Sequence, residues 1–407
     1  MTKLTYLIET QLKRLCTLLY LAILHTTSNV AYADTDDTIY FGIGANYQHD
    51  SNLFRLPSGQ QPLGLGAERA DNIIKEYVAI KIFKKYSLQA FDFDFVHSET
   101  KYANADFLNF NANNYKAAWL LSVTPELLGS LSTERTVELV PFINYQNTNK
   151  RNIKMIENQR FDFDWSPHQI WHLIGGYSKL TVANSQTFLP ETSFKLDEYE
   201  TGVKYSFPSQ SYISLKYRFR NGENNEINKF ALIGKNFTEK EEELNGVWIL
   251  SGKSRLNSNF GYINRIDDTF SIRDYSGYFG GINYVWDATS KLNLTLGLSR
   301  RLASFQDINS SYNVYDSVFI KPEWAVTSKL VVKASAEISK RKYVGGSPII
   351  FAMQREDDIK LYSLSADWSP RSTIAIGVNL QHDARNSNLI NRDYSSNSAG
   401  ISGQLLF

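Results

Sequence analysis

Three basic side chains stand at every second position of one short segment, where they could act together on a solute. Lys216, Arg218 and Arg220 alternate with apolar or aromatic residues between positions 211 and 220. Side chains two residues apart point to the same face of a β-strand, so these three would form a basic ladder. Charged rows set the selectivity of pores, and guanidinium groups also donate hydrogen bonds to sugar hydroxyls. The segment therefore predicts a surface that guides a charged or hydroxylated solute.

Further charged residues fall on the polar positions of other alternating segments. Together with the basic ladder, the candidate pore-lining residues are Arg301, Lys333, Glu337, Arg341, Asp383 and Arg385. Because both signs are present, such a lining suits a hydrophilic molecule that makes many weak contacts. The alternative for any single residue is that its polar side chain only keeps the lumen hydrated and binds no solute.

The sequence contains no motif of a catalytic site. It lacks G-x-S-x-G, H-E-x-x-H and the phosphate-binding P-loop. His168 and His172 would be about 13 Å apart on a strand. The segments 91–95 and 161–165 each place two aspartates on one face, which could be a carboxylate or Ca²⁺ site, although strand alternation alone produces the same pattern. We expect no enzyme activity, no cofactor and no metal.

The candidate residues lie in segments that share a two-residue period. Apolar and polar side chains alternate in 211–220, 291–301, 330–341 and 374–385. Such a period indicates β-strands with one apolar and one polar face. A soluble sandwich would bury the apolar face, whereas a membrane barrel would turn it to lipid and the polar face to a wet lumen.

The tryptophans reveal a longer repeat. Six of the seven end an alternating segment just before a short polar turn: Trp119, Trp165, Trp248, Trp286, Trp324 and Trp368. With Phe83, Phe207 and Phe407 they form a series with steps of 36 to 46 residues. A β-propeller has a similar period, but its GH and WD signatures are absent. Two strands per step predict a transmembrane antiparallel β-barrel of about 18 strands. A count of 16 strands is the alternative, because the region 126–160 could be either a long loop or bulged strands.

The first 33 residues are expected to be a cleaved secretory signal peptide. Lys13 and Arg14 precede the apolar run LCTLLYLAIL, and Ala31–Ala33 form a small-x-small cleavage site. The alternative, a membrane anchor, would need a longer apolar run. Residues 34–407 would then be a single barrel domain without cysteine, in the bacterial outer membrane. The formal net charge of +1 gives no indication of nucleic-acid binding.

The stretch HDSNLFRLP, residues 49–57, follows the first expected strand at 38–48. Asp50 and Asn52 favour a turn that bonds its own backbone. Leu53 and Phe54 would be exposed there unless they pack on the barrel or fold inward. The residues Asp50, Asn52, Leu53, Phe54 and Arg55 are therefore candidates either for packing or for contact with a sugar.

An alternating first strand followed by DSNLFRLP resembles the EpsL-type outer-membrane proteins of exopolysaccharide biosynthesis operons, within the family called "putative beta-barrel porin 2". The resemblance covers essentially all of 34–407, although His49 stands where a tyrosine is expected. It implies export of a polysaccharide through a polar, mixed-charge lumen, with periplasmic and inner-membrane export components as partners. The terminal Phe407 resembles the signal that the outer-membrane assembly machinery recognises, and lipid of that membrane would surround the barrel. The alternatives are a general or sugar-selective diffusion porin for small hydrophilic solutes, and a surface-binding barrel.

Overall fold

The computed structural model describes residues 38–63, 68–146, 150–168, 170–187, 192–229, 231–345 and 353–407. The expected signal peptide, 1–33, lies outside the described residues.

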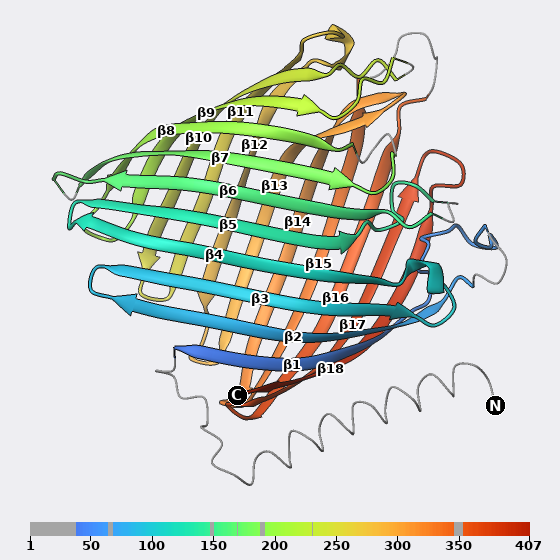
Figure 1. Ribbon diagram of the computed structural model, residues 1–407, viewed down its shortest axis with the longest axis horizontal. Coiled ribbons are helices and arrows are strands. Elements are labelled where there is room, and N and C mark those ends of the chain that lie inside the picture. Colours follow the sequence, from blue (N-terminus) through green and yellow to red (C-terminus); the bar gives the residue numbers. More distant parts are fainter. Residues whose placement is uncertain are drawn as a thin grey trace.

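Eighteen antiparallel strands form one closed sheet (Figure 1). The first nine are β1 (Ile39–Asp50), β2 (Asp71–Tyr86), β3 (Gln89–Tyr102), β4 (Phe110–Thr124), β5 (Leu127–Leu139), β6 (Ile153–Trp165), β7 (Trp171–Asn184), β8 (Phe194–Ser206) and β9 (Tyr212–Asn224). The second nine are β10 (Asn236–Ser251), β11 (Ser254–Asp267), β12 (Tyr275–Asp287), β13 (Leu292–Asp307), β14 (Ser310–Thr327), β15 (Leu330–Val344), β16 (Glu356–Arg371), β17 (Ile374–Ser387) and β18 (Tyr394–Leu406). Two single-turn 3₁₀ helices, η1 (Asp106–Leu108) and η2 (Ser271–Arg273), lie in long connections. Within the described residues, no helix has the length and apolar character needed to cross a membrane.

The sheet closes because β1 pairs with both β2 and β18. Gly42 lies opposite Ala79 of β2 on one side and opposite Leu406 of β18 on the other. The backbone N–H of Phe407 donates to the carbonyl of Phe41 at 2.8 Å, and the N–H of Phe41 donates back at 3.1 Å. Closure leaves neither edge strand unpaired, which is the condition for a sheet to sit in lipid.

The connections differ between the two ends of the barrel. Short turns join β2 to β3, β4 to β5 and the later pairs in the same order, and both described chain ends lie at this end. Longer connections occupy the other end, and the longest follow β1, β5, β9 and β15. The ambiguous region 126–160 contains β5, a loop and β6, so the count is eighteen rather than sixteen.

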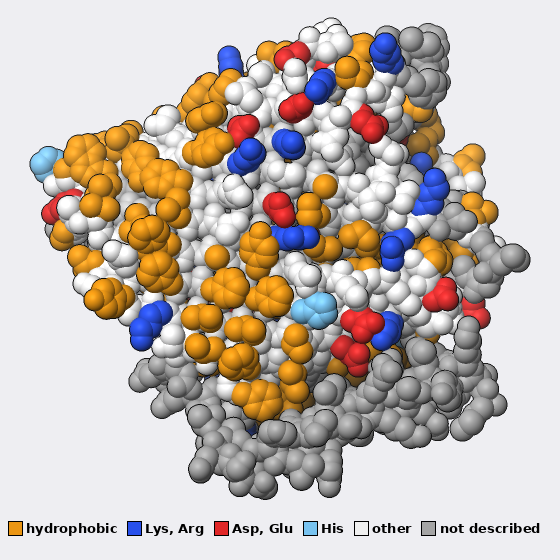
Figure 2. Space-filling model, viewed as in Figure 1, with side chains coloured by type: hydrophobic (Ala, Val, Ile, Leu, Met, Phe, Trp, Pro, Cys, Tyr) orange, Lys and Arg blue, Asp and Glu red, His pale blue; other side chains and the backbone are white. Residues whose placement is uncertain are grey.

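The outer face of the barrel is apolar. Six tryptophans near the short-turn ends of their strands are exposed: Trp119, Trp165, Trp248, Trp286, Trp324 and Trp368. Figure 2 shows apolar side chains gathered over the side of the wall near the short turns, with charged ones mainly toward the long loops. An apolar band bordered by an aromatic girdle is the exterior of a transmembrane barrel.

Candidate functional site

The basic ladder of β9 faces the lumen, as the alternation predicts, but carboxylates lie on both sides of it. The register places Glu200 of β8 and Glu241 of β10 directly opposite Arg218. Arg220 lies in the same way between Glu198 and Glu239. Directly opposite side chains on neighbouring strands are about 5 Å apart at Cβ, which is close enough for ion pairs.

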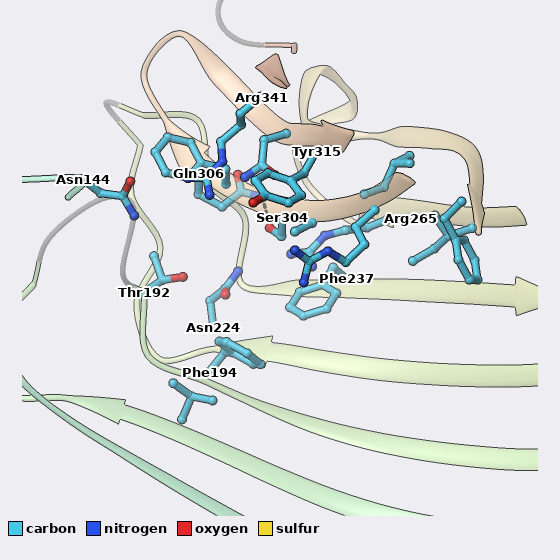
Figure 3. Close-up of a pocket in the computed structure, with 18 of the residues that line it drawn as sticks. Asn144, Thr192, Phe194, Asn224, Phe237, Arg265, Ser304, Gln306, Tyr315 and Arg341 are labelled. Carbon is cyan, nitrogen blue, oxygen red and sulfur yellow. Dashed lines mark hydrogen bonds between the residues drawn. The ribbon is translucent and has the colours of Figure 1, made fainter. Parts of the chain in front are cut away.

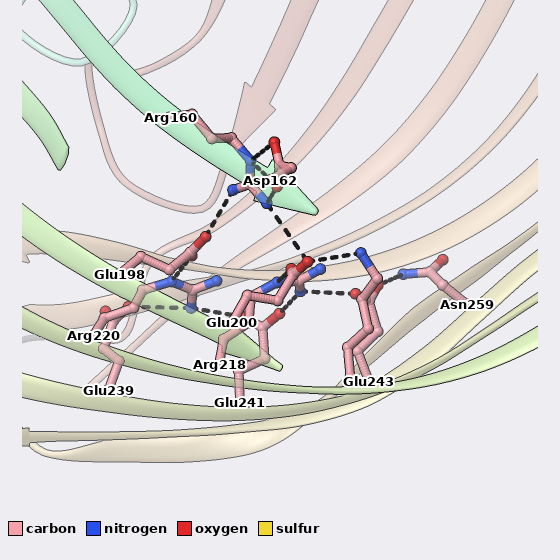
Figure 4. Close-up of polar contacts among 11 residues, drawn as sticks. Arg160, Asp162, Glu198, Glu200, Arg218, Arg220, Glu239, Glu241, Glu243 and Asn259 are labelled. Carbon is pink, nitrogen blue, oxygen red and sulfur yellow. Dashed lines mark hydrogen bonds and ion pairs between the residues drawn. The ribbon is translucent and has the colours of Figure 1, made fainter. Parts of the chain in front are cut away.

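These residues form a continuous ion-pair lattice (Figure 4). The Nε of Arg218 donates to Glu200 at 2.6 Å, and its Nη1 donates to Glu243 at 2.7 Å and also to Glu241. The lattice comprises the basic residues Lys216, Arg218, Arg220, Arg160 and Arg265 and the acidic residues Asp162, Glu198, Glu200, Glu239, Glu241 and Glu243. Five positive and six negative charges nearly cancel, so this wall is polar without a strong field of one sign.

The lattice corrects the prediction of a basic ladder, because the three basic residues are neutralised by their neighbours. Glu239, Glu241 and Glu243 are residues of the candidate site that the sequence did not single out. Their signal was present in the segment 238–244, TEKEEEL, where acidic residues occupy alternate positions. Alternation gives the face of each strand, but only the register shows which carboxylate meets which arginine.

At the loop end, three connections pack an apolar cluster. Its fully buried members are Phe54, Leu56, Tyr102, Ala105, Leu108, Val140, Phe142 and Tyr145. The rings of Phe54 and Phe142 are 4.8 Å apart between centroids. Burial of these side chains from three loops stabilises them mutually, since each buried aromatic or leucine contributes about 1.5–3 kcal/mol.

The stretch 50–57 contributes buried side chains to this cluster. Phe54 is 2% exposed, and Leu53 packs against the cluster from its side. Asp50 accepts hydrogen bonds from Arg55 at 2.9 Å and from Ser396 at 2.6 Å, and Asn52 bonds both the N–H and the carbonyl of Leu56. Arg55 adopts φ of +54°, a left-handed conformation that costs about 1–2 kcal/mol for a non-glycine residue. The ion pair with Asp50 offsets that cost.

The loop after β5 carries this cluster across the mouth toward β17. Arg385 of β17 donates to the carbonyl of Ile143 at 2.8 Å, and Arg392 donates to the carbonyl of Asn144 at 3.2 Å. The side chain of Gln146 also bonds the carbonyl of Arg55. Residues 140–146 are therefore a fixed crosspiece over the lumen.

A second arginine fixes the loops on the other side of the mouth. Arg273 of η2 is fully buried and donates to the carbonyls of Ser310 at 2.6 Å and Asp307 at 2.7 Å. It also bonds the carbonyl of Ala231. Burial lowers the pKa of the Arg273 guanidinium from its ordinary value. Its cross-links stiffen the rim above the cavity described next.

Beneath the crosspiece lies a cavity of about 690 Å³ (Figure 3). Lys154 of β6 and Arg341 of β15 both line it, and these strands are nine apart in the ring of eighteen. The cavity therefore reaches across the lumen. Its polar lining includes Asn144 from the crosspiece and Arg301 from β13.

The other predicted lining residues divide into three groups. Arg301 and Arg341 face the cavity, and Glu337 accepts a hydrogen bond from the hydroxyl of Tyr315 at 2.6 Å. Lys333 pairs with Asp367 at 3.2 Å, and both are about half exposed. Asp383 and Arg385 face inward, but they are buried beneath the loops at 8% and 0% exposure and line no open lumen. Asp383 accepts from Tyr394 at 3.0 Å, so the two residues hold loops in place.

Histidines and carboxylates do not gather into a metal site in the part of the chain that the structure describes. The two aspartates of 161–165 join separate contacts: Asp162 pairs with Arg160, whereas Asp164 pairs with Lys204 at 2.5 Å and His172 at 2.6 Å.

Comparison with known proteins gives a family match to part of the chain. The family model described as "Putative beta-barrel porin 2" matches residues 250–405. This match lies in the second half of the barrel and does not reach the motif at 50–57, so the EpsL-type assignment is not confirmed. A search of curated proteins finds no match.

Solved porins share the architecture. OpdQ from Pseudomonas aeruginosa superposes with a TM-score of 0.54 at 11% identity, covering 92% of this chain and 100% of OpdQ. A BenF-like porin from Pseudomonas fluorescens Pf-5 gives 0.52 at 11% identity, covering 92% and 99%. OpdK from Pseudomonas aeruginosa, solved with vanillate, gives 0.51 at 10% identity, covering 91% and 99%.

At such identities the likeness shows the fold alone. The chain has the closed eighteen-stranded fold of an outer-membrane porin, and the comparisons indicate no catalytic family. With its apolar exterior and aromatic girdle, it is a protein of the bacterial outer membrane.

Proposed function

We propose that this barrel is a diffusion porin for small hydrophilic solutes. The observation that carries the proposal is the cavity of about 690 Å³ beneath the crosspiece 140–146, whose lining combines apolar side chains with charged and amide groups. Cavities of roughly 300–1,000 Å³ are the size that small-molecule ligands occupy. A crosspiece fixed at both ends limits what passes by size, while the walls below it stay wet and charged.

The ion-pair lattice fits such a passage. Because its carboxylates and guanidinium groups already satisfy one another, they offer a passing solute hydrogen bonds without holding it tightly. Charged walls of this kind also keep the lumen hydrated. Among the structural neighbours, OpdK was solved with vanillate, a small carboxylate, and a solute of that class would fit the cavity here.

The proposal predicts ion conductance and size-limited sugar flux. Purified protein in planar bilayers should give discrete current steps, and liposomes containing it should swell in glucose faster than in a trisaccharide. A preparation that is folded, as judged by heat-modifiable gel mobility, yet conducts no ions would contradict the proposal.

A substitution in the crosspiece tests directly whether this segment limits the size of the solutes that pass. Phe142→Ala removes the ring that packs on Phe54 and should destabilise the loop cluster by about 3–5 kcal/mol, the usual cost of a buried Phe→Ala change. We expect trisaccharide flux to rise toward that of glucose. Ile390→Ala is the matched control, because Ile390 is 89% exposed in a neighbouring loop and should leave the flux unchanged.

Export of an exopolysaccharide is the second candidate, and the mixed-charge lattice on β8, β9 and β10 favours it. Alternating donors and acceptors along a wall suit a polymer that slides through many weak contacts. In a clean deletion strain, this function predicts polymer retained in the periplasm with little secreted product. Unchanged secretion would contradict export and leave the diffusion porin as the remaining proposal.

A further inference from the structure

Two arginines and a tyrosine form one layer on the cavity wall. Arg301 of β13, Tyr315 of β14 and Arg341 of β15 are directly opposite one another in the register. The guanidinium carbon of Arg301 lies 4.6 Å from the centroid of the Tyr315 ring, and that of Arg341 lies 5.1 Å from it. All three side chains line the cavity, where Figure 3 labels Tyr315 and Arg341.

These arginines differ from Arg265, which also lines the cavity but pairs with Glu239 at 2.9 Å. No carboxylate of the described chain forms an ion pair with Arg301 or Arg341. Among the described residues, the Nη1 of Arg341 donates only to the hydroxyl of Tyr343, at 3.5 Å. Two carboxylates on β15 and β16 bond other side chains. Glu337 accepts the Tyr315 hydroxyl, and Asp357, opposite Arg341, is bonded by Arg355 at 2.6 and 3.0 Å.

Unsatisfied polar atoms lie around the same space. The Nε of Arg341, the Oε1 of Gln306 and the Oδ1 of Asn144 are buried and have no hydrogen-bond partner within the described structure. Gln306 is only 5% exposed, and its Nε2 is already used on Ser304. The Nε of Arg265, which lines the same cavity, is also buried without a partner. Buried polar groups of folded proteins normally have partners, so four such atoms around one cavity point to an occupant.

The unused atoms define the chemistry of that occupant. Guanidinium N–H groups bind carboxylates with charge-assisted and often bidentate hydrogen bonds. The amide oxygens of Gln306 and Asn144 accept hydrogen bonds, which hydroxyl groups donate. We propose that the cavity is a binding site for a hydroxylated carboxylate such as a sugar acid, with its carboxylate on Arg301 and Arg341 and its hydroxyls toward Gln306 and Asn144. This deepens the proposed diffusion function, on which it rests, by naming the class of solute.

The test compares D-glucuronate with D-glucose, because the two sugars differ mainly in the carboxylate at C6. Isothermal titration calorimetry on the purified barrel in detergent micelles measures binding without requiring transport. We expect glucuronate to bind at least about tenfold more tightly than glucose, since a charge-assisted hydrogen bond contributes about 1.5–3 kcal/mol and 1.4 kcal/mol is a factor of ten.

Variants then locate the site. Arg301→Gln and Arg341→Gln should each weaken glucuronate binding about tenfold, whereas Arg341→Lys, which keeps the charge but loses the planar fork, should recover part of it. Arg255→Gln is the matched control, because Arg255 lies on the inward face of β11 near the short turns and outside the cavity lining. It should change binding less than about twofold. Heat-modifiable gel mobility shows that each variant is folded.

The outcomes separate this inference from the diffusion function. Equal binding of glucuronate and glucose, or an equal loss in Arg255→Gln, overturns the inference while ion conductance still supports the porin. Inorganic phosphate that binds more tightly than glucuronate also overturns the carboxylate assignment. Glucuronate binding without conductance would support the site and contradict the diffusion function.

Discussion

Two walls of the lumen, centred on β9 and on β14, use arginine in opposite ways. On β8, β9 and β10, Arg218 and Arg220 each contact three carboxylates. On β13, β14 and β15, Arg301 and Arg341 contact the ring of Tyr315 and pair with no described carboxylate. Arginine is therefore held by carboxylates in one wall and has no carboxylate partner in the other, and the difference lies in what the neighbouring strands place opposite it.

The largest expected effect comes from breaking the paired wall. Glu200 is held by Lys216 at 3.0 Å and Arg218 at 2.6 Å, and its side chain is 5% exposed. Glu200→Gln leaves those cations short of a partner and should lower the free energy of unfolding by about 2–3 kcal/mol. It should also shift ion selectivity toward anions, because it removes a negative charge from the lumen.

Urea unfolding in lipid vesicles and the reversal potential in a KCl gradient measure the two effects. Glu223→Gln is the control, since the pair of Glu223 with Lys235 is about half exposed and its loss should leave the free energy of unfolding nearly unchanged. A Glu200→Gln barrel as stable as the control would show that the lattice contributes nothing to stability.

A smaller effect should follow from giving the unpaired wall a carboxylate. Asn313 lines the cavity on the same face of β14 as Tyr315, two residues away. Asn313→Asp would supply a partner to the arginines and should weaken glucuronate binding about tenfold, with glucose binding unchanged. Asn313→Ser, which adds no charge, serves as the control. Calorimetry showing undiminished glucuronate binding in Asn313→Asp would mean that the arginines are not the binding groups.

The smallest effect is expected where a pair is open to water. Lys333 and Asp367 are 48% and 52% exposed, although Lys333 lies on the same strand as Arg341. Lys333→Gln should change the free energy of unfolding by less than about 0.5 kcal/mol, because water screens an exposed pair. A change as large as that of Glu200→Gln would contradict burial as the reason why the Glu200 pairs contribute more to stability than the Lys333 pair.

The strands were largely predictable because each carries its own two-residue period. The face of Lys216, Arg218 and Arg220 and the positions of the tryptophans near short turns follow from that period alone. The partners of the ladder could not be predicted so easily, since Glu241 meets Arg218 only in the observed register.

The loops could not be predicted because they have no period. Nothing in 140–146 signals that its backbone accepts hydrogen bonds from Arg385 and Arg392, more than 200 residues away. The position of Phe54 was likewise not predictable from the sequence. The sequence left packing and sugar contact open, and the structure places its ring against Phe142, at 2% exposure.

The hydrogen bonds between Phe41 and Phe407 have a consequence for biosynthesis. Because β18 and Phe407 pair with the first strand, no closed ring exists until the chain has been synthesised and exported through Phe407. A chain truncated before β18 would carry two open strand edges, whose bare amides and carbonyls lipid cannot solvate and which invite pairing with other chains. Loss of this one strand should therefore abolish insertion altogether and leave material for periplasmic proteases rather than a smaller pore.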